Sequence, residues 1–240
     1  METIRSEVAF EGARIPVFVA RPAEAPRASV LVLGAIWSVT PHIEDVCVRL
    51  AGEGFAAIAP CLFRGQDIPA PDASADVLAR TFLEFDDRRC LRDLRAVARE
   101  ADRGRFGTFP RLVPLGFCLG GRFAHLLAAT SEHVAGAIVF YGRMRFERQP
   151  VKPFLPIELT GLIEVPYLAH FAEHDMLIPL AHVEELRAAL AERGVPREVH
   201  VYAGAKHSFF DPTRADHDPA ASALAWSRSL EFLRGIAGAA

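Results

Sequence analysis

The stretch Gly116-Phe117-Cys118-Leu119-Gly120 constrains this chain more than any other part of its sequence. It follows an apolar run, Leu112 to Leu115, and precedes small and apolar residues typical of a helix. A G-x-nucleophile-x-G sequence between a strand and a helix is typical of the nucleophile elbow, a turn so sharp that its central side chain stands above the sheet. Glycines are required there because a β-carbon would collide with neighbouring backbone. The pattern therefore predicts Cys118 as a nucleophile at a strand end.

Two properties of such a turn assist a reactive thiol. The following helix directs the positive end of its dipole at the sulfur, which favours the thiolate. The amide of Leu119 faces the space in which a substrate oxyanion forms. On the motif alone an alternative stays open, because a small buried cysteine in a glycine-rich turn is common.

Apolar periodicity predicts strands and helices that alternate along the chain. The expected strands are 8–10 and 15–20 as an antiparallel hairpin, then 28–33, 55–59, 112–115, 136–141, 166–172 and 198–202. The first expected helix begins at Thr40-Pro41 and ends at Gly52, and the second covers 75–100 with a break near Phe85. Three more helices are expected at 122–129, 179–192 and 219–236. An irregular, proline-containing segment at 142–162 could cover a site.

This alternation predicts an α/β fold, with a mostly parallel central sheet and helices on both faces. We expect one domain over residues 1–240. The net charge of −3 is small, which argues against a nucleic-acid partner. The first residues lack the pattern of a signal peptide and no run is long enough for a membrane span, so we expect a cytoplasmic protein without a membrane partner. The four cysteines show no C-x-x-C spacing, which argues against a zinc knuckle and disulfides.

Candidates for a general base and its orienting acid lie where ligands bind in open α/β sheets, beyond the carboxyl ends of the strands. Asp175 follows the strand expected at 166–172, and His207 follows the strand expected at 198–202. The chain order nucleophile, acid, histidine is that of the α/β-hydrolase arrangement. We therefore predict a triad in which His207 takes the proton of Cys118 and Asp175 fixes the imidazole tautomer.

Three motifs carry a resemblance to a known family: Gly-Phe-Cys-Leu-Gly-Gly at 116–121, Glu173-His174-Asp175, and Lys206-His207-Ser208-Phe209. With them the chain resembles the dienelactone hydrolases, cysteine-dependent members of the α/β-hydrolase superfamily, over nearly its whole length. The resemblance implies the α/β-hydrolase fold and a Cys118-His207-Asp175 triad, with oxyanion donors from the amides of Leu119 and Ile36. It also implies hydrolysis of a small ester or lactone through a thioester, without metal or cofactor.

The chain departs from the family pattern at two positions. Ala35 stands where the family has a glutamate that contacts the resting cysteine, and Glu44 or His42 are the nearby candidates to replace it. Asp211 stands where the family has an arginine that helps to hold the substrate carboxylate, and Arg80 lies near the region of the other such arginine without being in register with it. Dienelactone itself is therefore not the expected substrate, and Asp211 near a pocket would disfavour an anion.

Aromatic residues directly after strands are candidates to line an apolar pocket, although each could equally belong to the core. Together with Arg80, the candidate substrate-binding residues are Trp37, Phe63, Tyr141 and Phe209. The expected partner is a small ester or lactone, and we expect a monomer or homodimer.

Other histidines and cysteines are weaker candidates for a functional role. His170-Phe171-Ala172-Glu173-His174 matches the H-x-x-E-H pattern of zinc proteases, which requires a helix. In the strand expected there, residues four apart lie roughly 13 Å apart, too far for two zinc bonds of about 2 Å, so we expect no metal. His125 is predicted as a hydrogen-bonded packing residue, and Cys61 as an inert thiol without an identifiable partner.

Two further classes of function remain as alternatives to an esterase. A non-catalytic or weakly catalytic protein could bind a small ligand on the same scaffold, which Ala35 and the missing arginine favour and the triad opposes. A thiol redox protein needs a resolving cysteine near Cys118, and the sequence identifies none.

Overall fold

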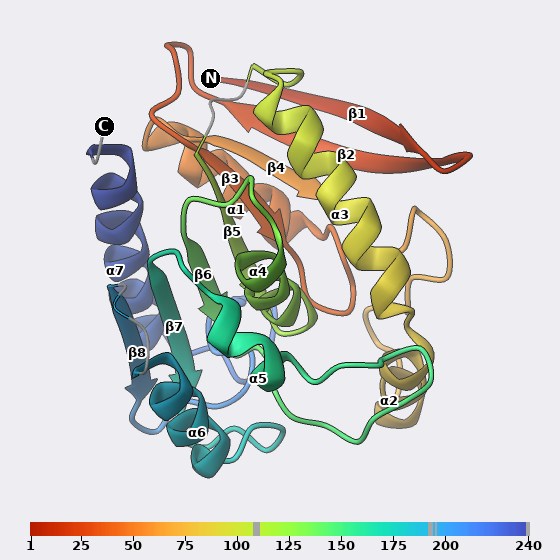
Figure 1. Ribbon diagram of the computed structural model, residues 1–240, viewed down its shortest axis with the longest axis vertical. Coiled ribbons are helices and arrows are strands. Elements are labelled where there is room, and N and C mark those ends of the chain that lie inside the picture. Colours follow the sequence, from red (N-terminus) through yellow and green to blue (C-terminus); the bar gives the residue numbers. More distant parts are fainter. Residues whose placement is uncertain (108–110, 192–193, 195, 239–240) are drawn as a thin grey trace.

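The structure, a computed structural model, describes residues 1–107, 111–191, 194 and 196–238. These residues contain an eight-stranded sheet with the spatial order β1-β2-β4-β3-β5-β6-β7-β8 (Figure 1). β2 pairs antiparallel with β1 and with β4, and every other neighbouring pair is parallel. The strands are β1 (Glu2–Phe10), β2 (Ala13–Arg21), β3 (Ser29–Leu33), β4 (Ala56–Pro60), β5 (Leu112–Phe117), β6 (Ala137–Phe140), β7 (Tyr167–Ala172) and β8 (Arg197–Tyr202).

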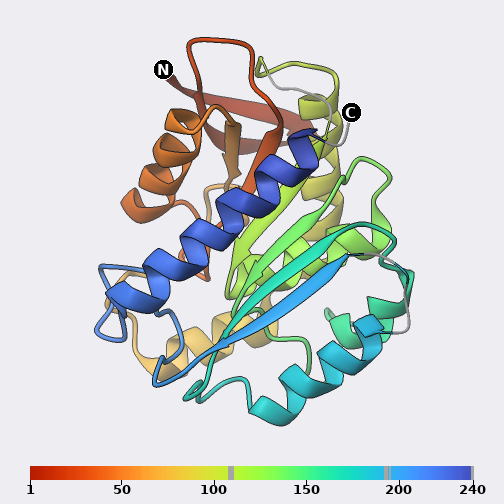
Figure 2. The same cartoon turned by 90° about the vertical axis from the view of Figure 1, so that its left-hand side faces the viewer.

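Helices cover both faces of this sheet (Figure 2). α1 (Pro41–Gly52) and α7 (Pro219–Gly238) lie on one face, and α3 (Asp87–Asp102), α4 (Leu119–Thr130) and α6 (Leu180–Ala191) on the other. β3, β4, β5, β6 and β7 are buried along their whole length because both faces are covered. This architecture confirms the predicted fold class. No helix within the described residues is long and apolar enough to cross a lipid bilayer.

The helix boundaries follow local signals that the sequence contains. Thr40 caps α1 by accepting a hydrogen bond from the N–H of Ile43 (3.4 Å), and Pro41 occupies the first turn. The long helix expected at 75–100 is interrupted at Phe85, as predicted, and divides into α2 (Ala75–Glu84) and α3. Asp86 then caps α3 by accepting from the N–H of Arg89 (3.0 Å). The break matters for the site because it lets α2 turn away from the sheet (Figure 1).

The segment expected to be irregular, 142–162, contains two short helices near its end. These are α5 (Pro156–Leu159) and a 3-10 turn at Thr160–Leu162. Earlier in the segment the Lys152 side chain is wholly buried and lies 3.3 Å from Asp87 at the start of α3. The periodicity missed α5 because a single helical turn is too short to show a repeat.

The turn between β5 and α4 has the close backbone packing that its glycines predict. A β-carbon on Gly116 would lie 2.1 Å from the carbonyl oxygen of Gly120, and one on Gly120 would lie 2.1 Å from the carbonyl oxygen of Leu33. Both oxygens belong to backbone that cannot move without shifting a strand or helix. The N–H of Gly120 also donates to the carbonyl of Gly34 (3.0 Å), which joins α4 to the loop after β3.

We predict that Gly120→Ala lowers the free energy of unfolding by at least about 2 kcal/mol, because the new methyl group must displace the backbone at Leu33. Gly235→Ala is the matched control, since a β-carbon at this exposed position of α7 has no neighbour within 4 Å. Alanine should stabilise that helix by about 0.5–1 kcal/mol relative to glycine. Urea unfolding followed by circular dichroism measures both, and equal unfolding midpoints for the two variants would contradict the packing argument.

Candidate active site

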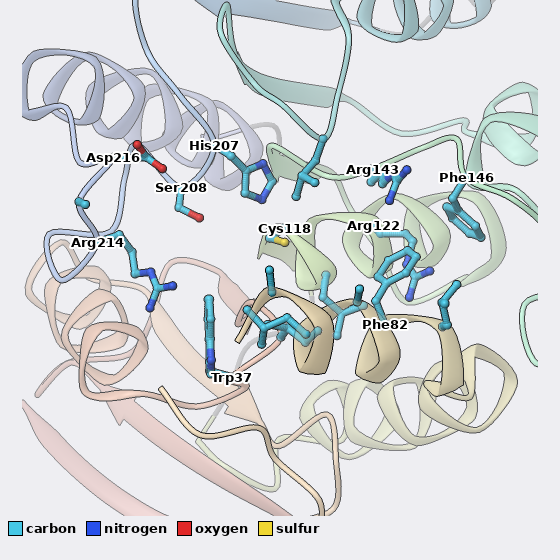
Figure 3. Close-up of a pocket in the computed structure, with 18 of the residues that line it drawn as sticks. Trp37, Phe82, Cys118, Arg122, Arg143, Phe146, His207, Ser208, Arg214 and Asp216 are labelled. Atoms are coloured by element: carbon cyan, nitrogen blue, oxygen red, sulfur yellow. The ribbon is translucent and has the colours of Figure 1, made fainter. Parts of the chain in front are cut away.

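A cavity of about 770 Å³ lies at the carboxyl ends of the parallel strands (Figure 3). Its walls come from the loop after β3, from α2, from the start of α4, and from the loops that follow β6, β7 and β8. Most of the wall is apolar, and the residues used below are Ile36, Trp37, Leu78, Phe82, Cys118, Leu119, Arg122, Arg143, Phe146, Leu177, His207, Ser208, Arg214 and Asp216.

Cys118 occupies the turn between β5 and α4 with backbone angles of φ 52° and ψ −109°. Residues other than glycine rarely adopt a positive φ, so the surrounding structure must hold this backbone conformation in place. The N–H of Cys118 donates to the carbonyl of Phe140 in β6 (3.0 Å), and the carbonyl of Cys118 accepts from the N–H of Arg122 (3.1 Å). The half-buried side chain consequently lines the cavity, as the elbow pattern predicts.

The predicted acid and histidine are in direct contact. Nδ1 of His207 lies 2.7 Å from Oδ2 of Asp175, whose side chain is only 1 % exposed. The other oxygen, Oδ1, accepts from the backbone N–H groups of Leu177 (2.8 Å) and Ile178 (3.1 Å). These bonds fix the carboxylate, and the carboxylate fixes the ring. Nε2 of His207 makes no hydrogen bond within ordinary geometric limits to a described residue, and the ring points toward the Cys118 sulfur (Figure 3).

The charges around His207 favour its protonated form. Burial acts against the imidazolium, but the Cys118 thiolate and the hydrogen bond to Asp175 outweigh burial and raise the pKa of His207 to about 10. The buried ring of Tyr141 packs 5.0 Å from the His207 ring and limits the access of water from that side.

Ile36 and Leu119, the predicted oxyanion donors, both line the cavity. Leu119 is the first residue of α4. Its N–H therefore has no hydrogen-bond acceptor within the helix, because the preceding turn of helix is missing. Ile36 lies in the loop after β3, which the bond from Gly120 to Gly34 ties to the same helix. The two residues are thus brought to one part of the cavity.

The aromatic candidates divide between the cavity and the core. Trp37 lines the cavity, with its Nε1 donating to the carbonyl of Ala70 (3.1 Å). Phe63 instead packs against Phe85 with ring centroids 4.8 Å apart. Tyr141 and Phe209 pack against each other at 5.4 Å.

Arg80 is exposed on α2, and none of Arg80, Phe63, Tyr141 and Phe209 lines the cavity. Of the five positions predicted to bind substrate, Trp37 therefore lines the cavity and the other four do not. The position directly after a strand fixes where the backbone is, but it leaves open whether a side chain turns into the cavity or into the core.

The residues near the two departures from the family pattern do not line the cavity either. Glu44 forms an ion pair with Arg5 (2.6 Å). His42 is buried between Phe117 and Phe210, each 5.9 Å from its ring, and burial lowers the pKa of His42. Oδ1 of Asp211 accepts from the N–H (2.9 Å) and hydroxyl (2.7 Å) of Thr213. None of Glu44, His42 and Asp211 reaches the cavity wall.

Two further histidines, His170 and His125, have structural partners. His170 lies in β7, a strand as predicted, where its ring contacts the hydroxyls of Tyr202 (2.9 Å) and Ser229 (3.1 Å). His125 contacts the hydroxyl of Tyr167 (2.8 Å) and the carbonyl of Pro156 (3.0 Å), and burial lowers its pKa to about 4. The prediction that His125 is a hydrogen-bonded packing residue is confirmed. Within the part of the chain that the structure describes, no three His, Cys, Asp or Glu side chains are grouped so as to hold a metal ion.

Several cavity residues were not predicted from the sequence. α2 contributes Leu78 and Phe82, and the segment after β6 contributes Arg143 and Phe146. Arg122 lies one turn after Cys118 in α4 and is wholly buried. The signal for Arg122 was present, because a charged residue in the otherwise small and apolar run 119–129 is rarely buried without a specific role.

The doubly wound sheet, the sharp strand-to-helix turn and the cavity at the strand ends define an α/β hydrolase. A model of the dienelactone hydrolase family matches residues 15–237. The chain therefore belongs to the dienelactone hydrolase family and is a hydrolase.

Proteins that are similar in sequence or structure support this family assignment. A protein of Escherichia coli K12 with the provisional name carboxymethylenebutenolidase is 33% identical over 239 residues, which cover 97% of this chain and 87% of the relative. A Bradyrhizobium protein, provisionally named a 2-oxo-3-(5-oxofuran-2-ylidene)propanoate lactonase, is 30% identical, covering 90% of this chain and 88% of its own. A crystal structure from Klebsiella pneumoniae, provisionally named a dienelactone hydrolase, superimposes with a TM-score of 0.89 at 32% identity, covering 98% of this chain and 99% of the other.

We predict that Cys118→Ala and Asp175→Asn each lower the pKa of His207 from about 10 towards its ordinary value of 6.5, because each removes a negative charge that stabilises the imidazolium. Since the folded-state pKa is the higher one, the stabilisation from this proton is full below about pH 6.5 and is lost as the pH rises through about 10.

Imidazole ring signals in an NMR titration measure the pKa, with His207→Gln to assign the resonance. Cys61→Ala removes a buried thiol that does not line the cavity and should leave the titration unchanged. A wild-type midpoint near 6.5 would show that the thiolate and imidazolium are not paired.

Proposed function

We propose that the chain hydrolyses a small ester or lactone through a thioester on Cys118, with His207 as the proton carrier and Asp175 as its orienting acid. The observation that carries the proposal is the 2.7 Å contact between Asp175 and His207, which turns the free ring nitrogen toward a cysteine held at positive φ in a largely apolar cavity. A cysteine in a merely structural role has no need of a charged partner fixed in this way.

In the proposed reaction the Cys118 thiolate attacks the carbonyl carbon of the substrate. The electron pair of the carbonyl moves to oxygen, where the amides of Leu119 and Ile36 stabilise it. When the carbonyl re-forms, the bond to the alkoxide breaks and His207 gives that oxygen its proton. Water then attacks the thioester with His207 as base, which releases the acid and restores the thiolate. In a lactone the leaving hydroxyl stays attached to the product.

The names of the E. coli and Bradyrhizobium relatives both denote enzymes that open unsaturated lactone rings. These names support lactones as the first substrates to test. Ala35 and Asp211 depart from the family pattern, so we propose the reaction class without assigning dienelactone as the substrate.

Other properties expected from the sequence remain predictions at this point. These are a single domain over residues 1–240, a monomer or homodimer, a cytoplasmic location and activity without a metal or cofactor.

We predict that wild-type protein hydrolyses a small activated aryl ester with turnover, and that Cys118→Ala and His207→Ala each reduce kcat/KM by about 10³-fold or more, because each removes a group that bonds to the reacting atoms or moves their proton. The measurement is the steady-state release of the aryl alcohol. Mass spectrometry of the quenched reaction after proteolytic digestion should show the acyl group on the peptide that contains Cys118.

Cys61→Ala is the matched control for loss of a thiol and should keep wild-type activity. Full activity in Cys118→Ala would assign the nucleophile elsewhere. A single acylation without turnover would instead favour the alternative of a binding or weakly catalytic protein, with Ala35 as the position to revert to glutamate.

A further inference from the structure

Residues 35–38, which we call the β3 turn, form a closed turn at the cavity wall. The N–H of Ser38 donates to the carbonyl of Ala35 (2.8 Å) and closes the turn. The two residues between them, Ile36 and Trp37, line the cavity, and the Trp37 ring stands on its wall in Figure 3. In a β-turn the N–H of the second residue takes no part in the closing bond. The N–H of Ile36 accordingly donates to no acceptor among the residues that the structure describes.

Ser38 ends the β3 turn in a backbone conformation that needs support. Its φ is 58°, a value that residues other than glycine rarely adopt. Its carbonyl oxygen folds back so closely on Gly34 that a β-carbon on Gly34 would lie 1.9 Å from it. The Ser38 side chain is wholly buried, although its hydroxyl is polar. Such a conformation persists only where the surrounding contacts hold it, so the partner of this hydroxyl matters for the turn.

The Ser38 hydroxyl links the β3 turn to the loop that follows β4. Its Oγ accepts from the backbone N–H of Leu62 (2.9 Å), and both residues are buried. The carbonyl of Leu62 accepts in turn from Nη2 of Arg89 in α3 (3.0 Å). Nη1 of Arg89 donates to the buried carboxylate of Asp93 (3.1 Å), which also accepts from Nε of Arg64 (2.7 Å). Leu62 is thus held from two sides, by the β3 turn and by α3.

The β3 turn is therefore fixed at both of its ends. At its start, the carbonyl of Gly34 accepts from the N–H of Gly120 in the first turn of α4 (3.0 Å). This bond places the turn beside Leu119, the residue directly before Gly120. At its end, the bond of the Ser38 hydroxyl limits rotation of the turn about that first attachment. Rotation would change the direction of the Ile36 N–H, so the bond at Ser38 bears on how this N–H is aimed.

We propose that Ser38 is a positioning residue of the oxyanion hole. Its hydroxyl, bonded to Leu62 and through Leu62 to Arg89, keeps the N–H of Ile36 directed at the carbonyl oxygen of the substrate. The inference rests on the proposed function, in which that N–H stabilises the oxyanion. Ser38 does not line the cavity, so it acts through Ile36 and not on the substrate. Because a donor is effective only when it is fixed before the charge develops, loss of the hydroxyl weakens binding of the transition state.

The first test is the steady-state hydrolysis of p-nitrophenyl acetate by Ser38→Ala. We expect kcat and kcat/KM each to fall about tenfold while KM stays within about twofold, because acylation and deacylation both form an oxyanion. The loss is smaller than the cost of about 10²- to 10³-fold for removing an oxyanion donor, since the Ile36 N–H is still present.

Ser229→Ala is the matched control. The hydroxyl of Ser229 is also wholly buried and bonds a backbone carbonyl, that of Ala225 in α7 (2.8 Å), but Ser229 does not line the cavity. This variant should keep wild-type activity, and thermal unfolding of both variants should remain cooperative. Equal losses of kcat in Ser38→Ala and Ser229→Ala, or a raised KM at unchanged kcat in Ser38→Ala, would overturn the proposal.

Arg89→Gln tests the connection to α3. This variant loses the bond to Leu62, and we expect kcat to fall about threefold, the effect of one modest hydrogen bond. If Ser38 and Arg89 act through Leu62, the double variant should be about tenfold slower than wild type, whereas independent effects would multiply to about thirtyfold. Arg95→Gln is the control on the same helix, because Arg95 also donates to a backbone carbonyl, that of Thr130 (2.6 Å), away from the cavity. Multiplying effects in the double variant would reject the connection through Leu62.

A last measurement needs no turnover and separates this inference from the proposed function. The backbone amide signals of Ile36 and Leu119 are followed by NMR while Cys118→Ala is titrated with butyrate, whose carboxylate presents a negative oxygen to the same donors. We expect both signals to move downfield with one dissociation constant, and the shift of Ile36 to be lost in the Cys118→Ala, Ser38→Ala double variant while that of Leu119 remains.

The two possible failures give different results. An Ile36 signal that does not respond to butyrate, or that responds equally with and without the Ser38 hydroxyl, rejects the positioning role even in a protein that hydrolyses esters. A response that depends on Ser38 in a protein that turns over no ester supports the positioning role and rejects only the proposed function.

Discussion

The close approach of three backbone segments at the turn after β5 fixes the rest of this site. Gly116 and Gly120 allow α4 to leave the sheet so sharply that its first turn lies against the carbonyl oxygens of Leu33 and Gly34 at the end of β3. Because β3 and β5 are neighbouring parallel strands, that contact places the loop after β3 beside the amino end of α4. The strained backbone of Cys118, and the positions of Ile36 and Leu119 in the cavity wall, all depend on this single contact.

The same sheet geometry explains why the acid and the histidine could be predicted from the sequence. β7 and β8 are parallel neighbours in register from Tyr167 with Arg197 to Ala172 with Tyr202. The loops that follow them therefore start at the same edge, and residues that are distant in sequence, such as Asp175 and His207, meet at 2.7 Å. Strand periodicity and the rule that parallel strands end together were sufficient for this inference, because neither depends on how the side chains pack.

The walls of the cavity could not be predicted in the same way. Phe63 and Phe209 follow strands but turn into the core, while Phe82 comes from α2, a helix without a buried residue that the break at Phe85 directs over the cavity. An amphipathic pattern shows that a helix has an apolar face, but not what that face covers. The apolar run around Arg122 marked it as unusual, but its ion-pair partner could not be predicted, since Asp87 lies 35 residues earlier in the chain, at the start of α3.

Charged side chains lie at both ends of this otherwise apolar cavity. Apolar contacts are not directional, so by themselves they would let an elongated substrate enter with either end first. At one end Arg214 stacks on the Trp37 ring, and Asp216 lies 3.7 Å from the Lys206 ammonium. At the other end Asp87 pairs with Arg122 and Lys152, and all three cations, Arg122, Lys152 and Arg143, lie within 5.6 Å of the Phe82 ring centroid. The charged groups at the two ends, unlike the apolar wall between them, are therefore the groups that can distinguish one end of an elongated substrate from the other.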